Sequence, residues 1–466
     1  MTKHNAMSLN LKLLHVAGIV APPNIKVSFF KTALYQLYIA CCYLVYIPVL
    51  SGQILALYHF WGDIEITTNN IFTLLGAFTC FVEATYARFN TRNIAQLFET
   101  FQNKLVPKMS TVGLTEKKEE IFHSASKKAR LNTLIVMIIL DLMVAAWAPA
   151  PFIKQLMEES KNVTNTETEA DRKWLNFCYI IWFPIDITVS PYFEIMYLIE
   201  CIVFIIGTTY LKAVEMTIAA MMVHISAQFA ILCTALEDVD KITSVSEEKM
   251  YSDTRKLFGR ETTSLEGTDD PEVIVLGSQE WKVIQTRRAT DCNTVDMDLQ
   301  HNERKNEDFP ELTCYLANFV QYHQAVIEFV ADVDKAVGPI FLVCFFIRQF
   351  LACVMSFQVA LTWGQDNNIL KFIFGFLGSM CSPAIFCWYG TAIIQSSLEL
   401  QRAAYECKWY QHSQILKHYM LMIIVRSQKP VRLSACQFYV ISLQTFGKMI
   451  NTIYAYFTLL KNQYEN

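Results

Sequence analysis

The sequence is poor in charged residues and lacks the common catalytic motifs. Only 18% of its 466 residues are Asp, Glu, Lys or Arg, and the formal net charge is -4. A basic surface of the kind that binds nucleic acids is therefore not expected, and we predict no nucleic-acid partner. The patterns G-x-S-x-G, G-x-x-x-x-G-K-S/T and H-E-x-x-H are all absent from the sequence. We therefore predict no catalytic residues and no enzymatic activity.

Patterns for metal ions and disulfides are missing as well. The chain has fourteen cysteines but no C-x-x-C pair, and most of them fall in or beside apolar segments, where a free cysteine behaves as a small hydrophobic residue. We expect no disulfide framework, no metal site and no cofactor. The first thirty residues also lack the apolar core of a signal peptide, so we expect the N-terminus to stay on the chain.

Apolar residues dominate the composition. They make up 53% of the chain, and several uncharged runs approach the ~20 residues that a helix needs to cross a bilayer. The sequence thus predicts an all-α integral membrane protein with seven transmembrane helices, in contact with membrane lipids. The predicted spans are Ala33–Tyr58, Ile71–Ala87, Leu134–Phe152, Pro191 into the 210s, Ala336–Trp363, Leu370–Ile394 and Phe438–Leu460.

Two helices are predicted to project beyond the membrane. The apolar pattern after Pro191 continues to Leu236, which is longer than the ~30 Å hydrocarbon layer requires at ~1.5 Å per residue. After Asp308 and Pro310, which are typical of helix starts, apolar residues repeat with helical spacing up to the fifth span. We therefore expect a helical anchor bundle outside the bilayer.

A polar insertion separates these two helices. Residues 237–311 contain nineteen Asp or Glu against ten Lys or Arg, which is typical of a loosely ordered loop. The predicted organisation is an N-terminal segment (1–32), spans one to four (33–236), the acidic loop (237–311), a cytoplasmic helix with spans five to seven (312–460) and a short tail (461–466).

Charge predicts the orientation. Nine Lys or Arg lie between residues 88 and 130 and six between 402 and 432, whereas the loop between the first two spans has none. The positive-inside rule then places the N-terminus in the cytoplasm and, after seven spans, the C-terminus outside. Asn162, in the only N-x-S/T sequon of the chain, falls in a loop that this topology makes extracellular, so we predict a glycoprotein with Asn162 as its acceptor.

The last predicted span is unusually polar for a membrane helix. Ser442, Gln444, Lys448, Asn451 and Thr458 interrupt its apolar residues, and each such group needs a partner or water inside the bilayer. We interpret the segment from Arg432 to Leu460 as a helix that faces both protein and water, which is typical of a pore wall.

Three stretches of the sequence resemble the insect odorant receptors. They are CWYGTAIIQSSLELQRAAYECKWYQHS (387–413), VRSQKPVRLSACQFYVISLQTFGKMINTIYAYFTLL (425–460) and HISAQFAILCTALEDV (224–239). The resemblance implies a ligand-gated, non-selective cation channel in the plasma membrane of olfactory sensory neurons. It also implies a heterotetramer in which an odorant-binding subunit, with its small volatile ligand, joins a shared co-receptor.

Features of this chain point to both kinds of subunit. The long 237–311 loop resembles the co-receptor, whereas AYFTLLKNQYEN at the C-terminus and LTCYLANFVQYHQAVIEFV ahead of span five resemble the variable odorant-binding subunits. We interpret the chain as an odorant-binding subunit. The alternatives are a seven-helix G-protein-coupled receptor and a transporter, but the first would reverse the topology and the second should show paired broken spans.

Ligand residues are implied by the family's pocket, which lies between helices in the outer half of the membrane. The candidates are Phe72, Phe78, Met143, Trp147, Tyr192, Met196 and Phe372. Trp147, Tyr192 and Met196 rank highest, because Tyr and Trp combine apolar area with a polar group and Met adapts to irregular shapes. Packing or lipid contact is the alternative for each of them.

Gate residues also follow from the resemblance, in which the final turns of span seven line the pore. Leu459 takes the place of the hydrophobic gate, with Thr458 and Leu460 beside it and Asn462 and Gln463 just beyond. Two cationic residues, Arg348 in span five and Lys448 in span seven, are costly in hydrocarbon unless paired or hydrated. We expect Lys448 to reach water, while Arg348 has Glu83, Asp141 and Glu200 as candidate partners.

Overall fold

Helices form nearly all of the described structure. The computed structural model describes residues 7–23, 28–113, 115–147, 177–184, 187, 189, 191–264, 310–361, 369–411 and 414–465. Its helices are α1 (Ser8–Val16), α2 (Phe29–His59), α3 (Ile64–Phe89), α4 (Thr91–Thr100), the π-helix η1 (Phe101–Leu105), α5 (Val106–Thr111), α6 (Glu116–Trp147), α9 (Tyr192–Ser264), α11 (Pro310–Leu361), α12 (Ile369–Glu406), the short η3 (Trp409–Gln411), α13 (Gln414–Ser427) and α14 (Leu443–Glu465). Strands β1 (Ser434–Ala435) and β2 (Tyr439–Val440) pair antiparallel just before α14.

Seven of the described helices occupy the positions of the seven predicted spans. Five of them, α2, α3, α9, α11 and α12, are long and apolar enough to cross a membrane. The described part of α6 ends at Trp147, within the third predicted span, and α14 mixes apolar with polar residues along its whole length. The fold is that of an all-α integral membrane protein, as the sequence predicts.

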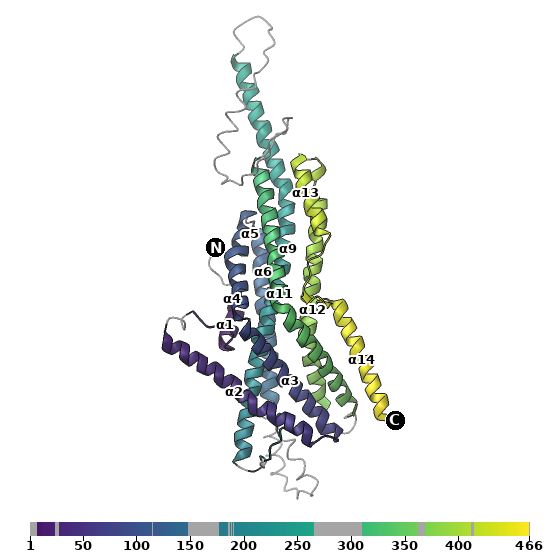
Figure 1. Cartoon of the computed structure of the whole chain (residues 1–466). Helices are drawn as coiled ribbons and strands as arrows, with labels where there is room; N and C mark the ends of the chain where they lie inside the picture. The colour runs from purple at the N-terminus through teal and green to yellow at the C-terminus, as the bar shows by residue number, and fades with distance from the viewer. Residues whose placement is uncertain are drawn as a thin grey trace.

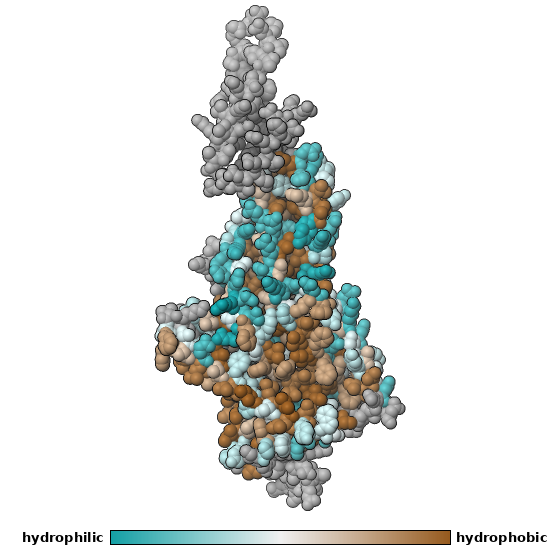
Figure 2. Space-filling view, viewed as in Figure 1, coloured by the Kyte–Doolittle hydropathy of each residue, from teal (hydrophilic) through white to brown (hydrophobic). Residues whose placement is uncertain are grey.

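The helices separate into a membrane part and a projecting bundle (Figure 1). α9, α11 and α12 run through both, while α4, α5 and α13 lie in the bundle and α2 and α3 cross the opposite part. Figure 2 shows hydrophobic residues gathered over the membrane part and hydrophilic ones over the bundle. Because the basic residues between 88 and 130 reach into the bundle, the bundle lies on the cytoplasmic side.

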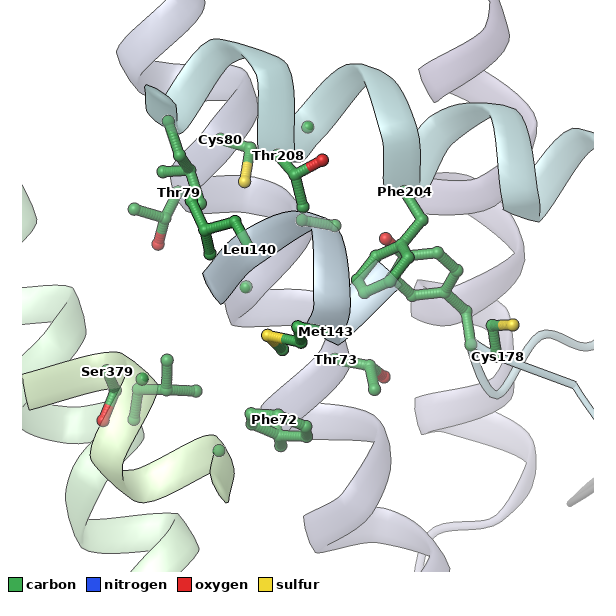
Figure 3. A pocket seen from close by; sticks show the side chains of 18 of the residues that line it. Phe72, Thr73, Thr79, Cys80, Leu140, Met143, Cys178, Phe204, Thr208 and Ser379 are labelled. Carbon is green, nitrogen blue, oxygen red and sulfur yellow. The ribbon is translucent and has the colours of Figure 1, made fainter. Parts of the chain in front are cut away.

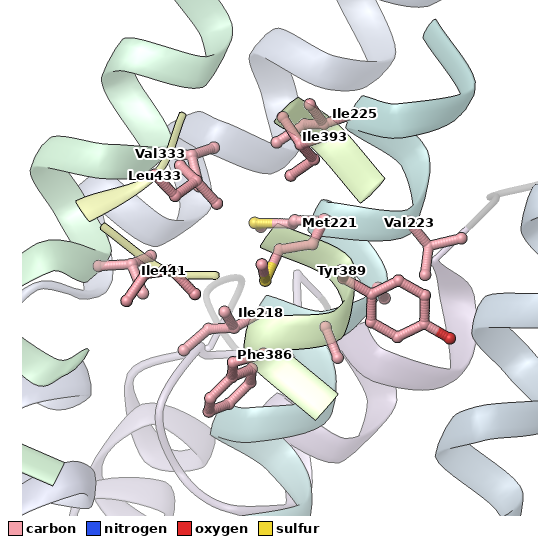
Figure 4. Packing of buried hydrophobic residues seen from close by; sticks show 14 of the residues in the cluster. Ile218, Met221, Val223, Ile225, Val333, Phe386, Tyr389, Ile393, Leu433 and Ile441 are labelled. Atoms are coloured by element: carbon pink, nitrogen blue, oxygen red, sulfur yellow. The ribbon is translucent and has the colours of Figure 1, made fainter. Parts of the chain in front are cut away.

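A continuous core joins the two parts. Ile218 and Met221 of α9, Phe386 of α12 and Leu433 and Ile441 beside the hairpin are all buried where the bundle meets the membrane helices (Figure 4). The base of α14 is therefore fixed to the buried core that joins the two parts.

The structure corrects the predicted C-terminal span. The segment from Arg432 to Leu460 is not one helix, because the hairpin occupies Ser434 to Val440 and α14 begins only at Leu443. Cys436 and Gln437 adopt positive φ angles of 50° and 65° in the turn. Ser442 then caps the helix by accepting the backbone N–H of Thr445 at 3.3 Å.

Two other boundaries also differ from prediction. α9 continues past Leu236 to Ser264, so the start assigned to the polar loop falls inside a helix, and residues 265–309 lie outside the described residues. The extension contains no proline and many good helix formers, which explains why it stays helical. α3 begins at Ile64, seven residues before the predicted Ile71, because Asp63 caps it by accepting the N–H of Ile66 at 3.1 Å. The helix predicted after Asp308 and Pro310 is present, and α11 is helical from Pro310, the first described residue of this segment.

Candidate ligand cavity and pore helix

A cavity of about 150 Å³ lies among the membrane helices α2, α3, α6, α9, α11 and α12. Phe72, Leu140, Met143 and Phe204 give it mainly apolar walls (Figure 3). A cavity of roughly this size is known to admit benzene. The space therefore suits a small apolar molecule of about one ring or an equivalent chain.

One side of the cavity is formed by a non-helical segment, residues 177–184. Cys178 and Tyr179 line the cavity, and the carboxylate of Glu200 accepts their backbone N–H groups at 2.9 and 3.5 Å. Non-helical backbone inside a membrane needs such a partner, because lipid offers none. Glu200 is fully buried and ties this segment to α9.

A buried ionic cluster forms another side of the cavity. Arg348 of α11 lines the cavity and pairs with Glu83 of α3 at 3.4 Å and with Glu215 of α9. Ser382 of α12 donates to the second oxygen of Glu215 at 2.5 Å, and Cys344 donates to Glu83 at 3.0 Å. The cluster thus joins the four helices α3, α9, α11 and α12, and its groups are costly to bury unless all are paired.

The other predicted partners of Arg348 have different roles. Asp141 forms an ion pair with Lys212, and Glu200 binds the non-helical segment at Cys178. Of the three predicted partners, only Glu83 contacts Arg348, whereas Glu215 was not predicted.

The pore-helix candidate α14 is fixed at its base and stands apart beyond it. Asp334 of α11 accepts the backbone N–H of Ser434 at 2.5 Å, and Thr391 of α12 accepts the N–H of Leu443 at 2.9 Å. Farther along, α14 diverges from the other helices (Figure 1), and Tyr454 and Leu459 are 67% and 59% exposed in the single chain. Large apolar residues exposed in this way are typical of an interface with other molecules.

Sequence comparison decides the family. The family model described as 7tm Odorant receptor matches residues 63–454, which is most of the chain. This protein is a member of the odorant receptor family. The resemblance seen in its C-terminal stretches is thereby confirmed.

Curated relatives of this odorant receptor are insect proteins. Odorant receptor 67c of Drosophila melanogaster is 30% identical over 185 residues, covering 40% of this chain and 45% of that protein. Odorant receptor Or2 of Anopheles gambiae is 27% identical over 151 residues, covering 32% and 39%. These alignments therefore span less than half the length of the relatives.

A solved structure shares the fold across almost the whole odorant receptor. The olfactory receptor OR5 from Machilis hrabei, determined in complex with eugenol, superposes with a TM-score of 0.69. The match covers 98% of this chain and 97% of that one, at 16% sequence identity. At this identity the likeness concerns the fold alone.

The predicted ligand residues of the receptor fall into separate places. Phe72 and Met143 line the cavity, and Phe372 is buried in the small apolar cluster that includes Phe72. Met196 packs against the main core and is not among the lining residues, while Phe78 and Tyr192 are 44% and 52% exposed. Trp147 ends α6, and its side chain lies outside the described residues. Ligand contact by any of them stays a prediction.

The predicted gate residues all lie in the last turns of α14. Leu459 and Asn462 are exposed, Thr458 and Leu460 are half-buried, and the side chain of Gln463 lies outside the described residues. Lys448 is exposed, in keeping with the expectation that it reaches water. Asn162 lies outside the described residues, so its glycosylation stays a prediction.

Several cavity residues were missed by the sequence analysis. Thr79, Thr208 and Ser379 line the cavity, each on a different helix. Hydroxyl residues within apolar spans could have indicated these positions. Such hydroxyl groups, however, also form hydrogen bonds with carbonyl groups of their own helix, so their presence alone does not indicate a cavity. Glu215 carried a clearer signal, since it is an acidic residue within the apolar run of span four.

Proposed function

We propose that this odorant receptor is the odorant-binding subunit of a ligand-gated, non-selective cation channel. The small volatile ligand binds in the cavity walled by Phe72 and Met143. Binding then opens a pore that α14 forms together with the corresponding helices of a co-receptor, in a heterotetramer. The site of action is the plasma membrane of olfactory sensory neurons.

The cavity is the observation that carries this proposal. It is lined by residues of six membrane helices and its walls are mainly apolar, as in sites for small organic ligands. Family membership supports the same ligand class.

A direct path links the cavity to the pore helix. α12 lines the cavity at Gly375 and Ser379 and continues to Gly390, which packs against the backbone of Ile441 just ahead of α14. A ligand that shifts α12 therefore acts on the base of α14 without an intermediate element.

The free face of α14 supports a channel made of several subunits. Its exposed tyrosines and Leu459 need to pack against other molecules in the membrane, and its polar residues need hydrogen bonds from water or from protein partners. Leu459 is the proposed hydrophobic gate, because apolar residues around a narrow pore stop ions by dewetting. Thr458, Leu460, Asn462 and Gln463 complete the proposed mouth.

The G-protein-coupled alternative gains no support from the family or the fold. The test is to express the full chain with the co-receptor, block G-protein signalling and apply a panel of volatiles. We expect ligand-evoked cation current that survives the block and is lost when this chain is omitted. Current that disappears under the block would contradict the proposal.

A further inference from the structure

The non-helical segment 177–184 is held in a fixed register along one face of α9. Glu200 accepts the backbone N–H of Cys178 at 2.9 Å, and the ring centre of Tyr179 lies 6.4 Å from that of Phe204. Glu200 and Phe204 are one turn apart on α9, so consecutive residues of the segment contact consecutive turns of the helix. The segment cannot slide along α9 without breaking these contacts.

This register brings two cysteines together. Cys201 follows Glu200 on α9, and its thiol is in hydrogen-bonding contact with the thiol of Cys178. The phenol of Tyr197, one turn earlier on α9, contacts the thiol of Cys201 as well. Both cysteines are half-buried, and Cys178 also lines the cavity beside Phe204 (Figure 3). The cavity wall and α9 therefore present two sulfur atoms to each other.

The pair lies on the side of the membrane where disulfides persist. α9 begins at Tyr192, at the end of the molecule opposite to the cytoplasmic bundle (Figure 1), and Cys201 lies within its first three turns. Disulfides form in the secretory pathway and persist at the cell surface, whereas thiols in the cytoplasm are kept reduced. A membrane protein passes through that pathway, so this pair meets an oxidant.

We infer that Cys178 and Cys201 form a disulfide in the receptor at the cell surface. The oxidant is the disulfide of a thiol–disulfide oxidoreductase of the secretory pathway, which accepts two protons and two electrons from the two thiols and leaves as a dithiol. The two sulfur atoms approach from a hydrogen-bonding contact to the ~2.0 Å of an S–S bond. The bond fixes the cavity wall at Cys178 to α9.

The chemical state of the two cysteines tests the inference without any ligand. Full-length receptor co-expressed with the co-receptor would be labelled with biotin at the cell surface, denatured in N-ethylmaleimide and digested without reduction. We expect mass spectrometry to recover the Cys178 and Cys201 peptides joined in most of the surface receptor, and separate after dithiothreitol. Cys436, exposed in the turn of the hairpin, should instead carry N-ethylmaleimide before reduction.

Variants measure what the bond contributes to stability. Cys178→Ala and Cys201→Ala each remove the same bond, so we expect either one to lower the melting temperature of the purified complex by about 3–8 °C. The double variant should melt close to the single variants, because a shared bond is lost only once. Dithiothreitol should lower the melting temperature of the wild type by a similar amount and have no further effect on the double variant.

Cys233→Ala is the matched control. Cys233 is also a half-buried cysteine of α9, but it lies in the part of the helix that belongs to the projecting bundle. This variant should keep the wild-type response to dithiothreitol. A response that is lost in Cys233→Ala would assign the reducible bond to a different cysteine and overturn the inference.

The other outcomes are equally decisive. Recovery of both peptides with N-ethylmaleimide from surface receptor would overturn the inference and show that the two cysteines pack as small apolar residues. Effects of the single variants that add up in the double variant would overturn it as well. Neither measurement uses a ligand or a current, so the proposed function stands or falls separately from the disulfide.

Discussion

Gly390 of α12 lies directly against the carbonyl oxygen of Ile441, two residues ahead of α14. A Cβ atom added to Gly390 would come within 2.2 Å of that oxygen, which is closer than any real contact. Only glycine allows this approach of a membrane helix to the base of the pore helix. The contact joins the ligand cavity, which α12 also lines, to the gate region.

Alanine at position 390 should therefore force α12 and the base of α14 apart. We expect Gly390→Ala to lower the free energy of unfolding by about 1–3 kcal/mol, as overpacked cores do, and to reduce ligand-evoked current per surface channel. Gly447→Ala is the control, since nothing lies within 4 Å of its added Cβ. Thermal unfolding of the purified complexes measures both variants, and equal melting temperatures would argue against the contact.

Removing Arg348 should leave two buried carboxylates without their cation. We expect Arg348→Ala to destabilise the receptor by about 3–5 kcal/mol, seen as loss of surface protein and a lower melting temperature. The double variant Arg348→Met with Glu215→Gln removes one positive and one negative charge, so it should recover part of that loss. No recovery would mean that Glu215 and Arg348 are not coupled.

Two methionines separate cavity contact from core packing. Met143 lines the cavity, whereas Met196 packs against the main core outside it. Met143→Ala should shift the ligand dose response roughly tenfold or more, because a lost buried contact costs up to a few kcal/mol. Met196→Ala, at matched surface expression, should shift it less. The reverse order in dose-response currents would move the ligand toward Met196.

Acid should weaken the projecting bundle through His323. This residue of α11 is buried beside Phe229 and Phe319, and burial, helped by the positive charge of Arg426, lowers its pKa from 6.5 to about 4. Above pH 6.5 the imidazole is neutral in both the folded and unfolded states and has no effect. Between pH 6.5 and about 4 only the unfolded chain binds the proton, so the free energy of unfolding falls as the pH falls.

The size of this effect is up to about 3 kcal/mol at pH 4. Other groups titrate in the same range, so the informative quantity is the difference between the wild type and His323→Leu in melting curves taken from pH 7 to pH 4. We expect the variant to lose less stability over this range. Parallel curves would show that His323 takes up its proton in the folded state.

Hydrophobic periodicity was sufficient to predict most of the long helices, although not all of their bounds. The helical spacing of apolar residues after Pro310 places α11 correctly, because a buried stripe is a property of the local sequence. The hairpin at Ser434 to Val440 could not be found in this way. It depends on Asp334, one hundred residues away, which binds the backbone of Ser434.

The cavity depends even more on distant contacts. Phe72 and Met143 line it while the exposed Tyr192 does not, although all three are large residues in predicted spans. Which face of a helix meets its neighbours is set by packing between helices, and a single sequence does not specify it. The same holds for Glu215, whose pairing with Arg348 requires α9 and α11 to lie side by side.

Current in excised membrane patches tests the central claim most directly. Patches from cells that express the full chain with the co-receptor would be bathed without GTP, so that no G-protein pathway operates. We predict ligand-evoked cation current in the wild type and a raised ligand-independent leak in Leu459→Ser. Leu443→Ser, at the other end of α14, is the control, and its leak should be close to that of the wild type. The account would be contradicted if the ligand-evoked current vanished on excision and if Leu459→Ser channels that reach the surface showed the same leak as the wild type.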